Sequence, residues 1–175
     1  LVMKKRLGRP TRRTIGGSSL IVGGTAFSLS LGGELLHVEI PRVAALTLHA
    51  VSILLIPVGL ISVQRLVSRN SPAVWLGWAG VALSVAGLLT RLELLMIGLA
   101  LFGSTLCLRR RWVSSPALIL GSTMFFAAYV FGTPIGTEGA SDPSVTLRAL
   151  FAVAIVLIGV GLVSTGYRYV LRGDV

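Results

Sequence analysis

The sequence predicts an all-α, polytopic helical membrane protein, with about six transmembrane helices arranged as three hairpins. Two observations lead to this prediction. Of the 175 residues, 54% are hydrophobic and 13% are charged, and the mean hydropathy is +0.88, so the chain has too few polar residues to cover a soluble globule. The apolar runs are also continuous and separated by basic clusters, whereas a transmembrane β-barrel shows segments of about ten residues with alternating polarity.

The transmembrane domain is expected to occupy residues 15–167, between a basic N-terminal segment, residues 1–14, and a C-terminal tail, residues 168–175. Its predicted spans are residues 15–35, 43–63, 73–90, 92–108, 117–131 and 147–167. Each run is about as long as a hydrocarbon layer requires, or slightly shorter. Ser-Pro pairs precede the third and the fifth runs, where Ser is a good N-cap and Pro fits the first helical position.

The boundary between the third and the fourth spans has the weakest signal, because Thr90, Arg91, Leu92 and Glu93 include no Gly, Pro or Asn. One long bent helix is the alternative, and it would reduce the number of spans to five. The distribution of basic residues favours six, because five spans would leave either the arginines at 109–111 or the C-terminal arginines outside the cell.

The charges predict that both termini are cytoplasmic and that the protein lies in the plasma membrane. The cytoplasmic side collects Lys4, Lys5, Arg6, Arg9, Arg12, Arg13, Arg65, Arg69, Arg109, Arg110, Arg111, Arg168 and Arg172. The outer side keeps Arg42, Arg91 and Arg148 with the acids Glu34, Glu39, Glu93, Glu138 and Asp142, and Asp174 is inside. We expect this net charge of +10 to bind the anionic lipid of the inner leaflet rather than nucleic acid.

The N-terminal residues also resemble the start of a signal peptide, since a basic segment precedes an apolar run. We interpret this run as a retained first helix, because it lacks a convincing cleavage site. The opening Leu-Val-Met leads to the hypothesis that the native chain begins at Met3. Arg outnumbers Lys fourteen to two, which is typical of a GC-rich prokaryote.

Small residues recur at helical spacing in three of the predicted spans, and such stripes let helix backbones approach closely. The glycines concerned are Gly16 and Gly23, Gly80 and Gly87, and Gly159 and Gly166. They would pack either against helices of the same chain or against another membrane protein. Aromatic residues also gather at the predicted cytoplasmic interface, namely Trp75, Trp78, Trp112, Tyr167 and Tyr169.

Residues for catalysis or metal binding are sparse, so we expect no enzymatic activity, no metal and no cofactor. Cys107 is the one cysteine, and no charged residue lies near the middle of a predicted span. His37 and His49 are the only cofactor candidates, because two histidines facing each other across helices could ligate haem and one could hydrogen-bond a quinone. Alternatively, His37, with Glu34 and Glu39 nearby, is an interfacial residue, and His49 hydrogen-bonds a neighbouring helix.

Two function classes fit these observations. The first is a non-catalytic integral membrane subunit or scaffold of a larger membrane protein complex, with another integral membrane protein as its partner. The alternative is a small uncoupled permease or channel, alone or as an oligomer, with a pore lined by Thr47, His49, Ser52, Ser104 and Thr105. A stoichiometric partner would favour the first class, and solute flux through the purified protein alone would favour the second.

Overall fold

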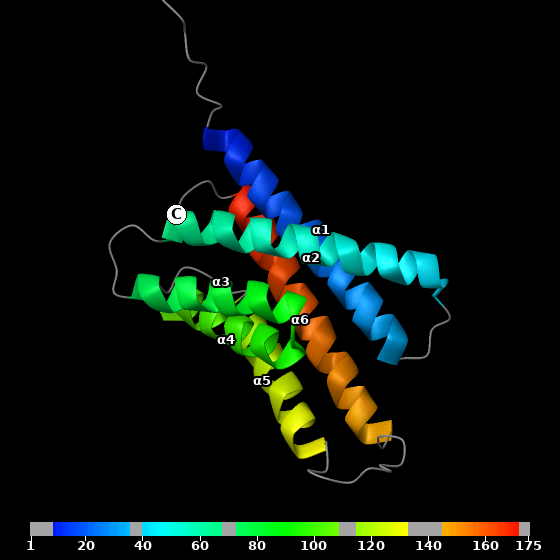
Figure 1. Cartoon of the computed structure of the whole chain (residues 1–175). Coiled ribbons are helices and arrows are strands. Elements are labelled where there is room, and N and C mark those ends of the chain that lie inside the picture. The colour runs from blue at the N-terminus through cyan, green and yellow to red at the C-terminus, as the bar shows by residue number, and fades with distance from the viewer. Residues whose placement is uncertain (1–8, 36–39, 68–72, 109–114, 133–144, 172–175) are drawn as a thin grey trace, which may run out of the picture.

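A computed structural model describes residues 9–35, 40–67, 73–108, 115–132 and 145–171 (Figure 1). These residues form the helices α1 (Arg9–Leu35), α2 (Arg42–Val67), α3 (Ala73–Leu89), α4 (Leu92–Leu108), α5 (Ser115–Gly132) and α6 (Val145–Leu171), and no strand is found among them. The all-α prediction is therefore confirmed. The predicted start at Met3 and the arginines at 109–111 lie outside the described residues.

The break between α3 and α4 is present, and it excludes the alternative of one long bent helix. The amide of Thr90 donates to the carbonyl of Gly87 at 3.3 Å, and α4 restarts where the amide of Leu94 donates to the carbonyl of Arg91 at 3.1 Å. The Thr90 hydroxyl donates to the carbonyl of Ala86 at 2.7 Å. The turn is thus closed by local hydrogen bonds to the last turn of α3, and Gly87 lets the backbone of α4 pass close to it.

Three helices, rather than the six predicted, are long and apolar enough to cross a membrane. Their candidate spans are Arg13–Gly33 in α1, Arg42–Arg65 in α2 and Leu147–Leu171 in α6, judged by length and composition over the described residues. The helices α3, α4 and α5 are apolar but have only 17, 17 and 18 residues. At ~1.5 Å per residue they reach about 26 Å, which is less than a hydrocarbon layer of about 30 Å.

The six helices pack in a closed ring, in which each helix contacts its neighbours in the chain and α6 returns to α1. The helices α1, α6 and α5 run diagonally, while α2, α3 and α4 run across them (Figure 1). Neighbours are antiparallel: Gly17 of α1 meets Gly166 of α6, whereas Gly24 meets the earlier residue Gly159. The packing of α2 against α3 is the least extensive in the ring.

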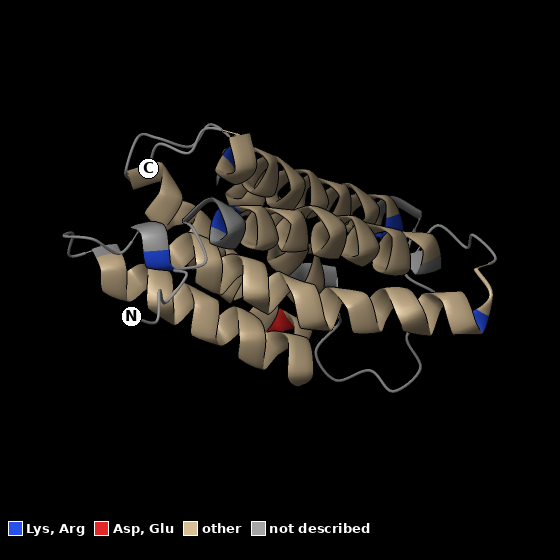
Figure 2. Ribbon diagram, turned by 90° about the horizontal axis from the view of Figure 1, so that it is seen from above, with Lys and Arg blue, Asp and Glu red and all other residues tan. Residues whose placement is uncertain are grey.

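The core is built from large apolar side chains that fit over glycines of the next helix. Leu20 of α1 is fully buried between Gly59 of α2 and Gly166 of α6. Other fully buried side chains are Phe27, Ile56, Leu60, Leu95, Leu99, Phe102, Leu106, Leu118, Ile155 and Ile158. In the described ribbon, arginines occur towards the two ends of the bundle, and most of the length between them is uncharged (Figure 2).

Candidate functional site

The six glycines singled out in the sequence all face helices of the same chain. Gly16 and Gly23 contact α2, Gly80 and Gly87 contact the backbone of α4, and Gly159 and Gly166 contact α1. A Cβ atom at Gly80 would lie 2.7 Å from the amide nitrogen of Phe102, and one at Gly166 would lie 2.5 Å from the carbonyl oxygen of Gly17. These faces are therefore occupied within the bundle, and none of them is left open for a partner protein.

The five predicted pore-lining residues are not brought together in one chain. Thr47 and His49 are exposed near the start of α2 and Ser52 is buried one turn further on, whereas Ser104 and Thr105 lie in the last turns of α4. Because α4 ends at the same end of the bundle as α2, the two groups are separated by most of the bundle length.

Their hydroxyl groups are also satisfied inside their own helices. The acceptors are the carbonyls of Val43 for Thr47 (2.7 Å), His49 for Ser52 (2.7 Å), Ala100 for Ser104 (2.8 Å) and Leu101 for Thr105 (3.0 Å). Such bonds let a hydroxyl sit in an apolar environment without a solute to coordinate. A lumen within a single copy of the chain is therefore not what these residues form.

The predicted cofactor pair cannot be assembled from the described residues, because His37 lies outside them. His49 is exposed on α2, and Cys107 is partly buried in α4. Within the described ranges, no group of three or more His, Cys, Asp or Glu side chains is arranged to hold a metal ion.

The first ten residues of α2 extend past the end of the neighbouring helix α3. Gln64 of α2 packs on Gly77 of α3, and the two helices are antiparallel, so Leu89 at the end of α3 lies opposite about Ser52. Residues 42–51 therefore have no α3 neighbour. We name residues 42–51 the α2 extension.

Buried residues of α2 begin at Ser52, the residue that lies opposite the end of α3. No residue of the α2 extension is buried, and Ser52 is the first buried residue of the helix. Val43 is 76% exposed and Leu46 is 70% exposed, and Thr47, His49 and Ala50 are also exposed. The α2 extension is thus a mainly apolar helical segment that carries Arg42, Thr47 and His49 and has no buried residue.

Gln64 is a buried polar residue that the sequence analysis missed. Its side chain has no exposed surface, its Nε2 donates to the carbonyl of Val74 at 3.2 Å, and its Oε1 has no hydrogen-bond partner. The amide fills the space over Gly77, where a Cβ atom would lie 2.6 Å from Cδ of Gln64. Gln64 precedes Arg65 in the sequence and reads as an interfacial residue, so nothing in the local pattern indicates its burial.

Tyr169 joins three helices and is also not the interfacial residue predicted. Its hydroxyl donates to the carbonyl of Ser62 in α2 at 2.8 Å, and its ring packs on Gly16 of α1. Only 3% of Tyr169 is exposed, whereas Tyr167 is 58% exposed and Trp75 is 81% exposed. The prediction of an aromatic belt therefore fits Tyr167 and Trp75 better than Tyr169.

No protein-family model, curated protein or solved structure matches the chain. The function is therefore inferred from the residues and their geometry.

Proposed function

We propose that this protein is a non-catalytic integral membrane subunit whose α2 extension packs against a transmembrane helix of a partner protein. The observation that carries this proposal is the exposure of His49 in a helical segment that has no buried residue. His49 follows Arg42 by seven residues, which places it about 10 Å along the helix from its start.

Histidines inside a membrane nearly always face the interior of a bundle or a water-filled cavity, because an imidazole in hydrocarbon loses its hydrogen bonds. A partner helix would give His49 such an interior and would cover the neighbouring side chains of Leu46 and Ala50. A lipid-facing role would explain the apolar residues of the α2 extension, but it would leave the imidazole without a partner.

We further propose that the protein lies in the plasma membrane as three hairpins with cytoplasmic termini, as the charges predict. The antiparallel packing supports this topology, because it brings Arg13, Arg65 and Arg168 to the same end of the bundle. That end would face the anionic inner leaflet. The short helices α3, α4 and α5 would be accommodated by local thinning of the bilayer or by the partner.

Site-specific photocrosslinking in native membranes tests the docking surface. A photoreactive residue at Ala50, in the α2 extension, should give one protein adduct of defined mass. A matched probe at Leu120, which is 53% exposed on α5, should give only lipid adducts. Equal protein adducts at both positions, or none at Ala50, would contradict the proposal.

Co-purification in mild detergent tests the role of the imidazole. His49→Leu should lower the amount of co-purified partner by about tenfold, as expected when one buried hydrogen bond to an ionisable group is lost. Leu54→Ala, a substitution at a 68% exposed residue beyond the α2 extension, serves as the control and should retain the partner. Native mass spectrometry of the purified sample would give the stoichiometry.

The permease or channel alternative is favoured by one feature of the same segment. If several copies met through the face of the α2 extension that carries Leu46, His49 and Ala50, the imidazoles would face a shared central space. The purified protein in liposomes would then run as a homo-oligomer and conduct a solute, and His49→Leu would change the flux. Purification as a fixed-ratio complex, with no flux through the isolated chain, would eliminate this alternative.

A further inference from the structure

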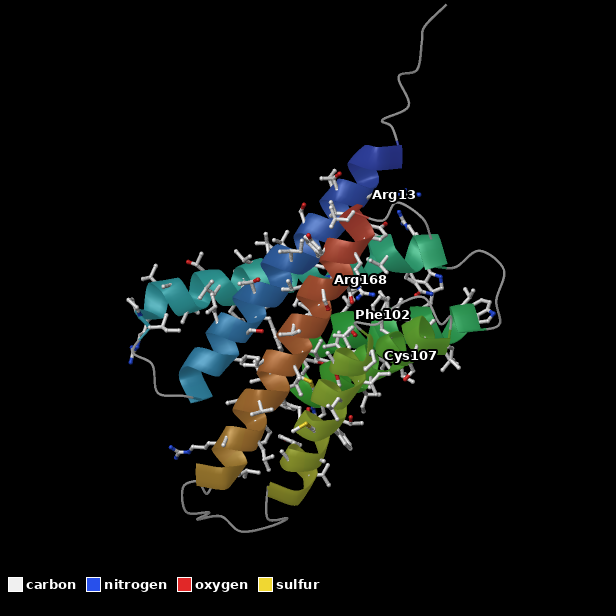
Figure 3. The ribbon with its side chains drawn as sticks, turned by 180° about the vertical axis from the view of Figure 1, so that it is seen from behind. Arg13, Phe102, Cys107 and Arg168 are labelled. Atoms are coloured by element: carbon white, nitrogen blue, oxygen red, sulfur yellow. The ribbon has the colours of Figure 1, made fainter. Side chains whose placement is uncertain are left out.

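The helices α1 and α6 lie side by side (Figure 3). An open groove is lined by residues of these two helices. Its volume is about 480 Å³, and its walls include Ile21, Thr25 and Leu29 of α1 and Val156, Val160 and Tyr167 of α6. Gly159 forms part of its floor, where Ser28 of α1 occupies the space that a side chain would take. The groove thus exists because the contact between α1 and α6 is built from small residues.

The lining of the groove suits a hydrocarbon chain rather than a polar solute. The hydroxyls in its wall are already used: Thr25 donates to the carbonyl of Ile21 at 2.8 Å, and Ser164 donates to that of Gly161 at 3.2 Å. Ser28 donates across to the carbonyl of Ile155 in α6 at 3.4 Å. Apart from Tyr167 at one end, the wall therefore presents mainly carbon atoms, and the hydroxyls of Thr25, Ser28 and Ser164 already donate to backbone carbonyls.

The length of the groove corresponds to one leaflet of a bilayer. From Tyr167 to Val156 it follows α6 for eleven residues, or about 16 Å. Half of a hydrocarbon layer of ~30 Å is about 15 Å. Tyr167 is 58% exposed at the mouth of the groove, as expected for an aromatic residue at the level of the headgroups.

Two arginines, neither of which lines the groove, lie at the end of the α1–α6 pair where Tyr167 is found. Arg168 lies one helical turn beyond Ser164, which lines the groove. Arg13 is at the same end of the α1–α6 pair (Figure 3). A chain in the groove would therefore bring the headgroup attached to it towards a guanidinium group, which favours a phosphate that carries a net negative charge.

From these observations we infer that the α1–α6 groove binds one acyl chain of an anionic phospholipid of the inner leaflet, with the headgroup at Arg168. This site rests on the proposed membrane location and is independent of docking through the α2 extension. A failure of the lipid experiment would therefore leave the crosslinking result at Ala50 unaffected, and the reverse also holds.

Native mass spectrometry of the full chain in mild detergent tests the site, with palmitoyl-oleoyl phosphatidylglycerol and palmitoyl-oleoyl phosphatidylcholine as probes. Phosphatidylglycerol should bind first and about fivefold more tightly, the factor expected for one basic residue near an anionic headgroup. Arg168→Gln should remove this preference. The matched control Arg148→Gln, at the other end of α6, should keep it.

A second pair of variants separates the acyl-chain site from general surface charge. Val160→Trp fills the groove and should weaken binding of both lipids at least fivefold, whereas Leu120→Trp on α5 should not. Circular dichroism would verify that each variant keeps its helix content. Equal affinity for the two lipids, or unchanged binding by Val160→Trp, would overturn the inference. Lipid-free dimers that Val160→Trp dissociates would also overturn it, because they would assign the groove to a second copy of the chain.

Discussion

The helices α1 and α2 are nearly equal in length, with 27 and 26 residues, but they have different surroundings. In the apolar window of α1 56% of the residues are buried, and in that of α2 only 22% are buried, although α2 is the more apolar helix. α1 carries glycines on two faces, because Gly16 and Gly23 contact α2 while Gly17 and Gly24 contact α6. In these two helices, glycines thus mark the faces that contact other helices, and the more hydropathic helix is the more exposed.

The strongest test of this comparison is to enlarge a glycine on the α1–α6 contact. In Gly166→Leu the new Cβ would lie 2.5 Å from the carbonyl oxygen of Gly17 and 2.9 Å from Cβ of Leu20, so the helices must separate. We expect the free energy of unfolding to fall by about 3 kcal/mol, measured by denaturant titration in detergent with circular dichroism. Ala50→Leu in the α2 extension is the control, and equal losses in both variants would refute the comparison.

Enlarging a glycine at the α2–α3 contact should lower the free energy of unfolding by less, because this contact is smaller and depends on one polar pair. Gly77→Ala would push the Gln64 amide away from the carbonyl of Val74. The expected loss in the free energy of unfolding is about 2 kcal/mol. In a Gln64→Ala background the same substitution should cost less than about 0.5 kcal/mol. A double-mutant cycle measures this coupling, and a coupling energy near zero would show that the two residues do not touch.

Removing the hydrogen bond between Tyr169 and α2 should lower the free energy of unfolding by a still smaller amount. Tyr169→Phe keeps the ring over Gly16 but loses the hydrogen bond to the carbonyl of Ser62. Its free energy of unfolding should fall by about 1 kcal/mol. Tyr167→Phe removes a hydroxyl from an exposed side chain and should be neutral. A loss for Tyr167→Phe that matched the loss for Tyr169→Phe would argue against the three-helix contact.

The smallest effect is expected in the α2 extension itself. Thr47 is exposed, and its hydroxyl bonds only within its own helix, to the carbonyl of Val43. Thr47→Val should therefore change the free energy of unfolding of the isolated protein by no more than about 0.5 kcal/mol. A larger destabilisation, measured by the same detergent titration, would mean that the α2 extension packs against the bundle more closely than its low burial indicates.

The helices themselves could be predicted from the sequence, because each apolar run is bounded by charges or by a Ser-Pro pair. Even the turn at Thr90 was predicted without a helix-breaking residue, on the distribution of arginines alone. The bounds of α3 and α4 agree with the predicted runs to within one residue, and those of α5 to within two. The prediction that each of these three short helices crosses the membrane is not supported, because hydropathy shows that a run is apolar and does not show that a bilayer surrounds it.

The candidate site could be predicted only in part. The sequence indicates Thr47 and His49 as pore-lining candidates, but their exposure follows from the register between α2 and α3, which places Ser52 opposite the end of α3. That register depends on Gln64 meeting Gly77 across two helices. Which residue of one helix meets which residue of the next depends on how the helices pack. The periodic pattern within a single helix does not predict it.

The closure of α1 against α6 has a consequence for the biosynthesis of the protein. Gly17 and Gly166 are separated by almost the whole chain, so their contact can form only after α6 has been translated. At ~5–20 residues per second, Gly17 waits about 7 to 30 seconds for Gly166. During that interval the glycine face of α1 has no α6 to cover it, and in the proposed membrane location it would be open to other helices. A chain truncated before α6 would keep this face uncovered permanently.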